Sequence, residues 1–194
     1  MSNQHYYKQK SSANSFLLLP GLNGGVDSPL MQDTYIRCQE RGSVLAVDYP
    51  FYVRGMARAS EGLREEVSLL QTAYAFLKQE LPNSHITIIG KSLGGIVIAN
   101  WLEQYGKPDV SVALLAFDRG EQNMKAKPFE GRLKVVIQGE HDSYGNGRAI
   151  IEELATYAIG AEVIEIPGVD HSYRPNGENA ALDALFTAID SMDV

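Results

Sequence analysis

The sequence of 194 residues contains a single cysteine, Cys38, so no disulfide bond can form within the chain. This composition fits a reducing compartment. Residues 1–15 are polar and lack the apolar core of a signal peptide. Every apolar run is far shorter than the roughly 20 residues that a membrane-spanning helix needs. We therefore expect a soluble protein of the cytoplasm.

Positive charge is scarce as well. Seventeen Lys and Arg residues face 24 Asp and Glu residues, which gives a formal net charge of −7, and the basic residues form no cluster. Because nucleic acids and anionic membranes attract basic patches, neither is an expected partner. No group of His, Cys and Asp residues has the spacing of metal ligands, so we expect no metal or other cofactor. The expected partner is a small-molecule substrate.

Apolar residues gather in six short runs that alternate with longer amphipathic segments. The runs are apolar without strict alternation, as in strands covered on both faces. They are Phe16–Leu19, Val44–Val47, Ile86–Ile89, Val112–Phe117, Leu133–Ile137 and Val163–Ile166. Helical patterning is found at 29–41, 61–80, 93–105, 147–159 and 178–190. The alternation predicts an α/β fold, a three-layer α/β/α sandwich around a mostly parallel sheet of about six strands.

Domain organisation follows from the same pattern. Residues 15–194 are expected to form a single domain, and residues 1–14 a loose polar lead-in. In a parallel sheet covered by helices, ligands bind at the carboxyl ends of the strands. Functional side chains should therefore lie directly after the apolar runs.

One such position is Gly90-Lys91-Ser92-Leu93-Gly94-Gly95, between a strand-like run and a helix-like segment. This is a G-x-S-x-G pattern in the strand–turn–helix setting that exposes a nucleophilic serine at a sharp turn. Glycine on either side leaves room for the neighbouring backbone. Ser92 would also lie at a helix N-terminus, where amide groups favour developing negative charge. The pattern predicts Ser92 as a nucleophile.

The letters Gly-Lys-Ser also end a phosphate-binding loop. That loop requires glycine five positions before its Gly-Lys pair, and here the position holds His85. The intervening residues, Ile86–Ile89, form a predicted strand rather than a flexible loop. We therefore exclude a phosphate-binding loop.

An acid is expected on the loop after a later strand, before the histidine in chain order. The run Leu133–Ile137 leads into Gln138-Gly139-Glu140-His141-Asp142. Asp142 is the preferred acid and Glu140 its nearest rival. The alternative for Asp142 is that it only caps the following turn.

The base is chosen among four histidines. His5 lies in the lead-in, His85 opens a strand at the wrong edge of the sheet, and His141 is the immediate neighbour of Asp142. His171 lies on the loop after the last predicted strand, where the base belongs. Asp142 would hold its Nδ1–H, and its Nε2 would take the proton of Ser92.

Two backbone donors are needed for the oxyanion of an acyl-transfer intermediate. One should be the N–H of Leu93, directly after the nucleophile. The first predicted strand runs into Pro20-Gly21-Leu22-Asn23-Gly24-Gly25, and the second donor should be Leu22 or Asn23 in this loop. The alternative is an ordinary glycine-rich turn.

Taken together, residues 19–25, 90–95, 138–142 and 168–172 resemble the α/β-hydrolase superfamily, and more narrowly its small dienelactone-hydrolase-like members. The resemblance covers residues 16–190 and implies the same Ser–Asp–His triad. Two positions depart from the family: Pro20 replaces the histidine of many relatives, and Ser92 replaces the cysteine of dienelactone hydrolase itself. The chain starts at the third strand of larger members, so their amino-terminal antiparallel strands are expected to be missing.

Larger relatives insert a lid where this chain has only Asp118–Arg132, so we expect no cap over the site. An open site suits small or soluble acyl esters. Tyr49, Phe51 and Arg54, which follow the second predicted strand, and Tyr173 are candidate substrate contacts. The alternative is that the aromatic residues are buried loop anchors.

The resulting prediction is an esterase-like serine hydrolase that forms an acyl-enzyme on Ser92. Esters, thioesters, lactones and peptides share this machinery, as does an acyltransferase that excludes water. The other class is a non-catalytic scaffolding or binding protein that keeps the fold. The intact triad and its surrounding glycines favour the enzyme.

Overall fold

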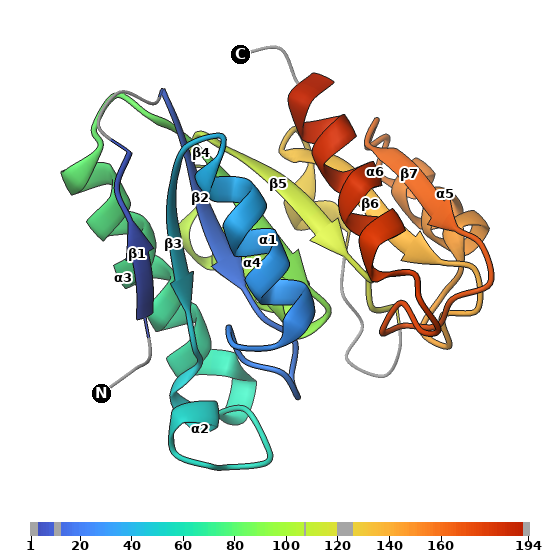
Figure 1. Cartoon of the computed structure of the whole chain (residues 1–194), viewed down its shortest axis with the longest axis horizontal. Coiled ribbons are helices and arrows are strands. Elements are labelled where there is room, and N and C mark those ends of the chain that lie inside the picture. Colours follow the sequence, from blue (N-terminus) through green and yellow to red (C-terminus); the bar gives the residue numbers. More distant parts are fainter. Residues whose placement is uncertain (1–3, 10–12, 107, 120–125, 192–194) are drawn as a thin grey trace.

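A computed structural model describes residues 4–9, 13–106, 108–119 and 126–191 of the chain. A seven-stranded sheet with the order β1-β3-β2-β4-β5-β6-β7 forms its centre (Figure 1). The strands are β1 (Gln4–Tyr7), β2 (Asn14–Leu19), β3 (Ser43–Val47), β4 (His85–Lys91), β5 (Val110–Leu115), β6 (Leu133–Gly139) and β7 (Glu162–Ile166). Strands β2 to β7 are parallel to their neighbours, and β1 is antiparallel to β3.

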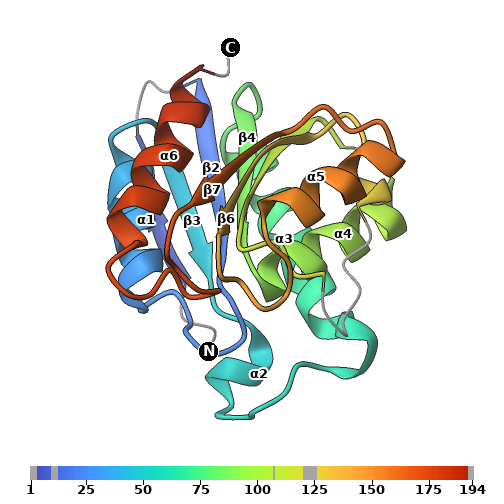
Figure 2. The same cartoon turned by 90° about the vertical axis from the view of Figure 1, so that its right-hand side faces the viewer.

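Helices cover both faces of this sheet. They are α1 (Pro29–Gln39), α2 (Pro50–Val53), α3 (Arg64–Glu80), α4 (Leu93–Tyr105), α5 (Gly147–Thr156) and α6 (Glu178–Ser191), with short 3-10 turns η1 (Glu61–Leu63) and η2 (Lys127–Phe129). Figure 2 shows α1 and α6 on one face and α3, α4 and α5 on the other. The three-layer α/β/α sandwich predicted from the alternating pattern is confirmed.

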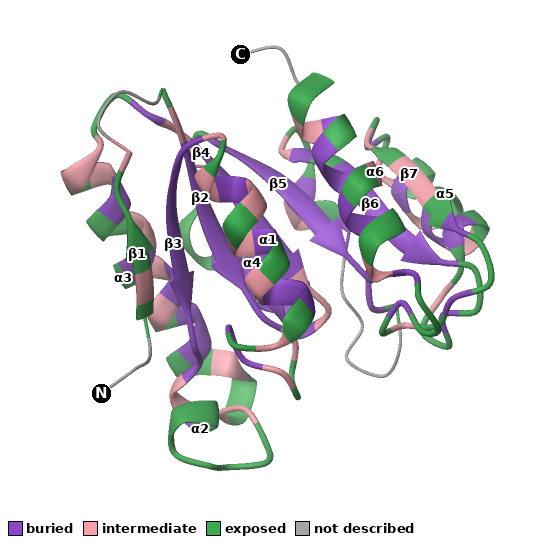
Figure 3. Ribbon diagram, in the orientation of Figure 1, coloured by how far each residue is buried: buried purple, intermediate pink, exposed green. Residues whose placement is uncertain are grey.

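Two hydrophobic cores, one on each face, explain why the strand sequences are apolar without alternation. Successive side chains of a strand point to opposite faces. In β2, Leu17 and Leu19 pack in the core under α3 and α4, whereas Phe16 and Leu18 pack in the core under α1 and α6. All four are buried, as are most strand residues (Figure 3). Each such side chain contributes on the order of 2 kcal/mol to folding.

The amino-terminal segment differs from the prediction. Instead of a wholly loose lead-in, residues Gln4–Tyr7 form β1, which pairs with Val44–Val47 of β3. Strand β2 begins at Asn14. Strand β1 has little apolar patterning because an edge strand is held mainly by backbone hydrogen bonds, so its side chains can stay exposed. The expectation that no antiparallel strand precedes the parallel sheet is therefore wrong; residues 1–3 and 10–12 lie outside the described residues.

Larger relatives carry a lid at the position of Asp118–Arg132. The structure describes this segment only in part, because residues 120–125 lie outside the described residues. The described part contains the short turn η2, whose Phe129 is buried. Helix α2 was not predicted because its four residues are too few to show a helical period; Pro50 at its first position fixes a helical φ.

The sheet order creates a crevice between β2 and β4. After β2 the chain turns to α1 on one face, and after β4 it turns to α4 on the other face. Such a switch point leaves the loops at the carboxyl ends of two adjacent parallel strands separated by a gap, where ligands of α/β proteins bind. The loop after β2 and Ser92 after β4 meet at this place.

Candidate active site

Ser92 occupies a strained turn between β4 and α4. Its backbone has φ 48° and ψ −109°, a conformation that residues with a side chain rarely adopt. The turn is held by a hydrogen bond of 2.9 Å from the Ser92 backbone N–H to the carbonyl oxygen of Leu115 at the end of β5. The strain therefore persists because the neighbouring strand fixes it, and it presents the serine hydroxyl above the sheet.

The glycines around Ser92 are required by close packing. A Cβ atom on Gly90 would lie 2.8 Å from the backbone carbon of Gly94 and 2.9 Å from the nitrogen of Gly95. A Cβ atom on Gly94 would lie 2.5 Å from the carbonyl oxygen of Leu19. Both positions exclude any side chain, which is the physical reason for the G-x-S-x-G pattern.

The three residues predicted as a triad are brought together in a chain of hydrogen bonds. The Nε2 of His171 lies 2.9 Å from the Oγ of Ser92, and its Nδ1 lies 2.7 Å from the Oδ2 of Asp142. An ionised carboxylate only accepts hydrogen bonds, so Nδ1 carries the hydrogen and Nε2 is free to accept one from the serine. The arrangement can move a proton from the hydroxyl to the imidazole.

The carboxylate of Asp142 is fully buried and hydrogen-bonded at both oxygens. Its Oδ1 accepts the backbone N–H of Tyr144 at 2.8 Å, so the turn-capping role considered from the sequence is also present. Its Oδ2 accepts the side-chain amide of Gln138 at 2.8 Å in addition to His171. The rival acid, Glu140, accepts the backbone N–H of Gly168 instead.

A cleft of about 1400 Å³ opens above Ser92. The three residues predicted to form an oxyanion hole, Leu22, Asn23 and Leu93, line it together with Ser92 and His171. Leu93 is the first residue of α4, where backbone N–H groups have no partner within the helix. Residues from the loop after β2 and from the start of α4 thus line the same cleft as the serine.

Lys91 is a site residue that sequence reasoning did not single out. Its Nζ donates a hydrogen bond of 3.2 Å to the carbonyl oxygen of His171, and its side chain packs against Gly21. Burial lowers the pKa of Lys91, and the nearby carboxylates of Asp142 and Asp170 partly oppose this effect. The lysine therefore joins the loop of the histidine to the loop after β2. Its place between Gly90 and Ser92 was the only available signal.

Tyr144 was also missed. Its ring packs edge-on against the imidazole of His171, with 4.6 Å between ring centroids, and it lines the cleft. The side chain is 43% exposed, so it forms an aromatic wall that a bound molecule can contact. Its position two residues after Asp142 is the feature of the sequence that could have indicated a place in the site.

The four residues predicted to contact substrate do not line the cleft. Tyr49 and Phe51 are buried, and their rings are stacked with 5.7 Å between the ring centroids. Tyr173 is also buried, and its hydroxyl donates a hydrogen bond to the carbonyl oxygen of Ile137. Arg54 forms an ion pair with Glu65. The aromatic residues are buried loop anchors, the alternative considered from the sequence. A strand-end position does not decide whether a side chain turns inward or toward the opening.

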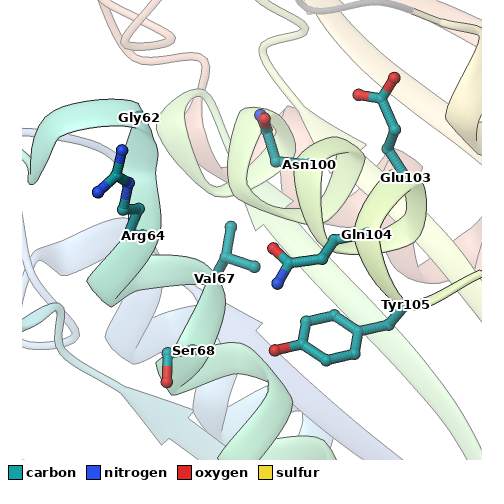
Figure 4. A pocket seen from close by; sticks show the side chains of 8 residues that line it. All are labelled: Gly62, Arg64, Val67, Ser68, Asn100, Glu103, Gln104 and Tyr105. Carbon is teal, nitrogen blue, oxygen red and sulfur yellow. The ribbon is translucent and has the colours of Figure 1, made fainter.

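A second hollow of about 410 Å³ lies between α3 and α4 (Figure 4). Its described lining includes Arg64, Ser68 and Glu103 but no histidine that could activate the serine. Within the described ranges, no three His, Cys, Asp or Glu side chains gather as metal ligands. No described helix has the length and apolar character needed to cross a membrane.

Comparison with known proteins identifies the family. The sequence pattern of the alpha/beta hydrolase domain matches residues 12–189. The chain belongs to the α/β-hydrolase family. No curated protein sequence matches the chain. Membership supports a hydrolase, in agreement with the expectation from the motifs.

Solved structures of other α/β hydrolases share the fold at low sequence identity. A protein of unknown function from Agrobacterium tumefaciens, described as a candidate α/β hydrolase, is 14% identical, with a TM-score of 0.80 over 97% of this chain and 92% of that chain. A serine hydrolase without a lid from Xanthomonas campestris is 14% identical, with a TM-score of 0.74 over 97% and 87%. The dienelactone hydrolase of Anabaena variabilis is 16% identical, with a TM-score of 0.74 over 97% and 89%. The predicted likeness to dienelactone-hydrolase-like members is confirmed.

Proposed function

We propose that this α/β-hydrolase family member is an esterase-like serine hydrolase with Ser92 as nucleophile, His171 as general base and Asp142 as the acid that orients the histidine. The observation that carries the proposal is the continuous hydrogen-bond relay from Asp142 through both ring nitrogens of His171 to the Ser92 hydroxyl. A serine hydroxyl is a weak nucleophile until such a base takes its proton.

In the proposed reaction, the Oγ of Ser92 attacks the acyl carbon while its proton passes to the Nε2 of His171. The negative charge on the former carbonyl oxygen is stabilised by the backbone N–H groups of Leu93 and of Leu22 or Asn23. His171 then protonates the departing alcohol or thiol, which leaves an acyl-enzyme. Water then attacks the acyl-enzyme while its proton passes to the Nε2 of His171. His171 returns this proton to the Oγ of Ser92 as the acid product departs, and Asp142 stabilises the imidazolium in both steps.

The proposed substrates are small or soluble acyl esters or thioesters. The cleft mixes polar residues such as Asn23 and Ser143 with apolar ones such as Leu22 and Ile96, so it suits a molecule with both characters. The family neighbour from Xanthomonas campestris is described as lacking a lid, and we propose the same for this chain. The cytoplasmic location expected from the sequence stays a prediction.

The test is covalent labelling with a fluorophosphonate probe, read by intact mass. The wild type should gain one adduct, and Ser92→Ala should gain none while keeping the same melting temperature. Ser143→Ala is a matched control, because this serine lines the same cleft without contacting His171 in the described hydrogen bonds. An unlabelled but folded wild type would favour a scaffolding or binding protein that retains the fold.

A further inference from the structure

We propose that Gln138 is a positioning residue of this site, which holds the Asp142 carboxylate in the orientation that His171 requires. Gln138 lies near the end of β6 and is completely buried. The inference rests on the proposed function, because it assigns a role within the same triad.

A polar amide inside a strand covered on both faces needs every hydrogen bond satisfied. The Oε1 of Gln138 accepts the backbone N–H of Phe117 at 2.8 Å. Its Nε2 donates to the Oδ2 of Asp142 at 2.8 Å and to the carbonyl oxygen of Gly145 at 2.6 Å, with the carbonyl oxygen of Phe117 at 3.3 Å. One side chain thus connects Phe117, just after β5, with Asp142 and Gly145 in the loop after β6.

The surrounding groups fix which way the amide faces. The Phe117 N–H can only donate, so the oxygen of the Gln138 amide must face it. The Asp142 carboxylate and the Gly145 carbonyl can only accept, so the nitrogen must face them. If the amide were rotated by 180°, its nitrogen would face the Phe117 N–H and its oxygen would face the Asp142 and Gly145 oxygens, so every pair would repel. The backbone groups of Phe117 and Gly145 therefore keep the Nε2 of Gln138 directed at Asp142.

This contact joins the nucleophile to the acid through the sheet. The Ser92 N–H is bound to Leu115, and two residues later Phe117 is bound to Gln138. The intervening Ala116 has φ 55°, so the chain turns sharply there and does not continue β5. Gln138 then reaches Asp142 across the loop. The relative position of the two ends of the triad is set along this route.

Gln138 also helps to hold the plane of the Asp142 carboxylate in one orientation. Both the Gln138 amide and the His171 Nδ1–H bind Oδ2, while Tyr144 holds Oδ1. Rotation of the carboxylate about its bond would break all three hydrogen bonds. Without the amide, Oδ2 has only the histidine, and the buried carboxylate loses a donor that stabilises its charge.

Gln138→Met tests this role, because methionine is of similar length and removes the whole amide. We expect the rate constant of labelling at saturating fluorophosphonate to fall about ten- to a hundredfold, the range seen for partners that orient metal-bound histidines. The probe concentration for half-maximal rate should stay unchanged, since Gln138 does not line the cleft. Gln71→Met is the matched control: it removes a hydrogen bond of 2.8 Å from Trp101, remote from the triad, and should leave the labelling rate unchanged.

Gln138→Glu gives a second readout that a merely structural residue would not change. The introduced carboxyl would lie against Oδ2 of Asp142, and two carboxylates that close cannot both ionise. The pair then shares a proton, which keeps a donor toward Asp142 until that proton is lost at higher pH. The other titratable groups that face Asp142 are His171, Lys91 and Tyr173. The variant should label along a bell-shaped pH profile, whereas the wild type reaches a plateau.

Melting curves recorded over the same pH range separate positioning from folding. The positioning role requires that labelling of Gln138→Glu declines at a pH where the variant is still folded. If both Gln138 variants label at the wild-type rate and with the wild-type pH profile whenever they are folded, Gln138 only stabilises the fold and the inference is wrong. Failure of the wild type to label would overturn the proposed function instead, so the two failures are distinguishable.

Discussion

Single atoms decide the chemistry of this site. The two oxygens of Asp142 are divided between a backbone N–H at Oδ1 and the histidine at Oδ2. The carboxylate therefore stabilises its own loop and also selects the tautomer of His171. These two tasks can be separated experimentally, because an amide at this position can keep the first and lose the second.

Asp142→Asn should lower kcat/KM for an activated ester about 10⁴-fold. The asparagine amide can donate to the imidazole and stabilise the wrong tautomer, so Nε2 carries the hydrogen and cannot accept the serine proton. Steady-state hydrolysis kinetics measure the change. Glu140→Gln is the control, since Glu140 contacts the Gly168 backbone and not His171, and its kcat/KM should stay within a few-fold of the wild type.

Asp170, next to His171, should make stability depend on pH. Hydrogen bonds from the backbone N–H groups of Arg174 and Ser172 lower the pKa of Asp170. A lowered pKa contributes stability that is fully present above the unfolded value of about 3.9 and is lost as pH falls through the lower folded value. Asp170→Asn should melt below the wild type at pH 7, and the difference should vanish under acid conditions. A difference that is constant over pH would contradict this assignment.

The strand–turn–helix unit β4–Ser92–α4 places the nucleophile. Helix α4 packs so closely on β2 that no side chain fits between Gly94 and the carbonyl oxygen of Leu19. Leu19 is the last residue of β2, before the loop that carries Leu22 and Asn23. The position of the nucleophile and that of the proposed oxyanion loop are therefore coupled by one helix–strand contact.

Gly94→Ala tests this contact through the sign of its effect. In an ordinary helix, alanine is more favourable than glycine by roughly 0.5–1 kcal/mol. Here the added Cβ meets the carbonyl oxygen of Leu19, so we expect a loss of about 1–3 kcal/mol, as for overpacked cores, and slower labelling of Ser92. Chemical denaturation measures the stability. Gly160→Ala, where a Cβ meets nothing within 4 Å, should change neither quantity.

At the level of the whole molecule, the sheet has six parallel strands and an antiparallel strand at one edge. Strand β1 covers the backbone of β3, whose residues Ser43–Val47 are all buried. An uncovered apolar strand edge invites pairing with another chain. Strand β1 therefore protects one edge of the sheet without contributing a residue to the triad.

Deletion of residues 1–9 should lower the melting temperature and cause association at high protein concentration, because the β3 edge becomes free. Differential scanning fluorimetry and size-exclusion chromatography measure the two effects. Tyr7→Ser is the control, since it changes a 38% exposed side chain and keeps the strand pairing. A truncated chain that melts and elutes as the intact one does would show that β1 is dispensable.

Much of this protein is determined by the sequence alone. Six apolar runs predict the parallel strands because both faces of each strand are buried. The order of the three motifs predicts Ser92, Asp142 and His171, since parallel strands bring their carboxyl ends to one edge, and the structure places these side chains within hydrogen-bond distance.

Other features were decided only by the tertiary structure. The sequence could not say that Tyr49, Phe51 and Tyr173 turn inward, because side-chain direction depends on packing between elements rather than on position along the chain. Strand β1 is held by backbone hydrogen bonds, which any sequence without proline can form. In the sequence, nothing distinguishes Gln138 from any other polar residue that precedes a glycine. Its role depends on three partners, Phe117, Asp142 and Gly145, that only the folded chain brings together.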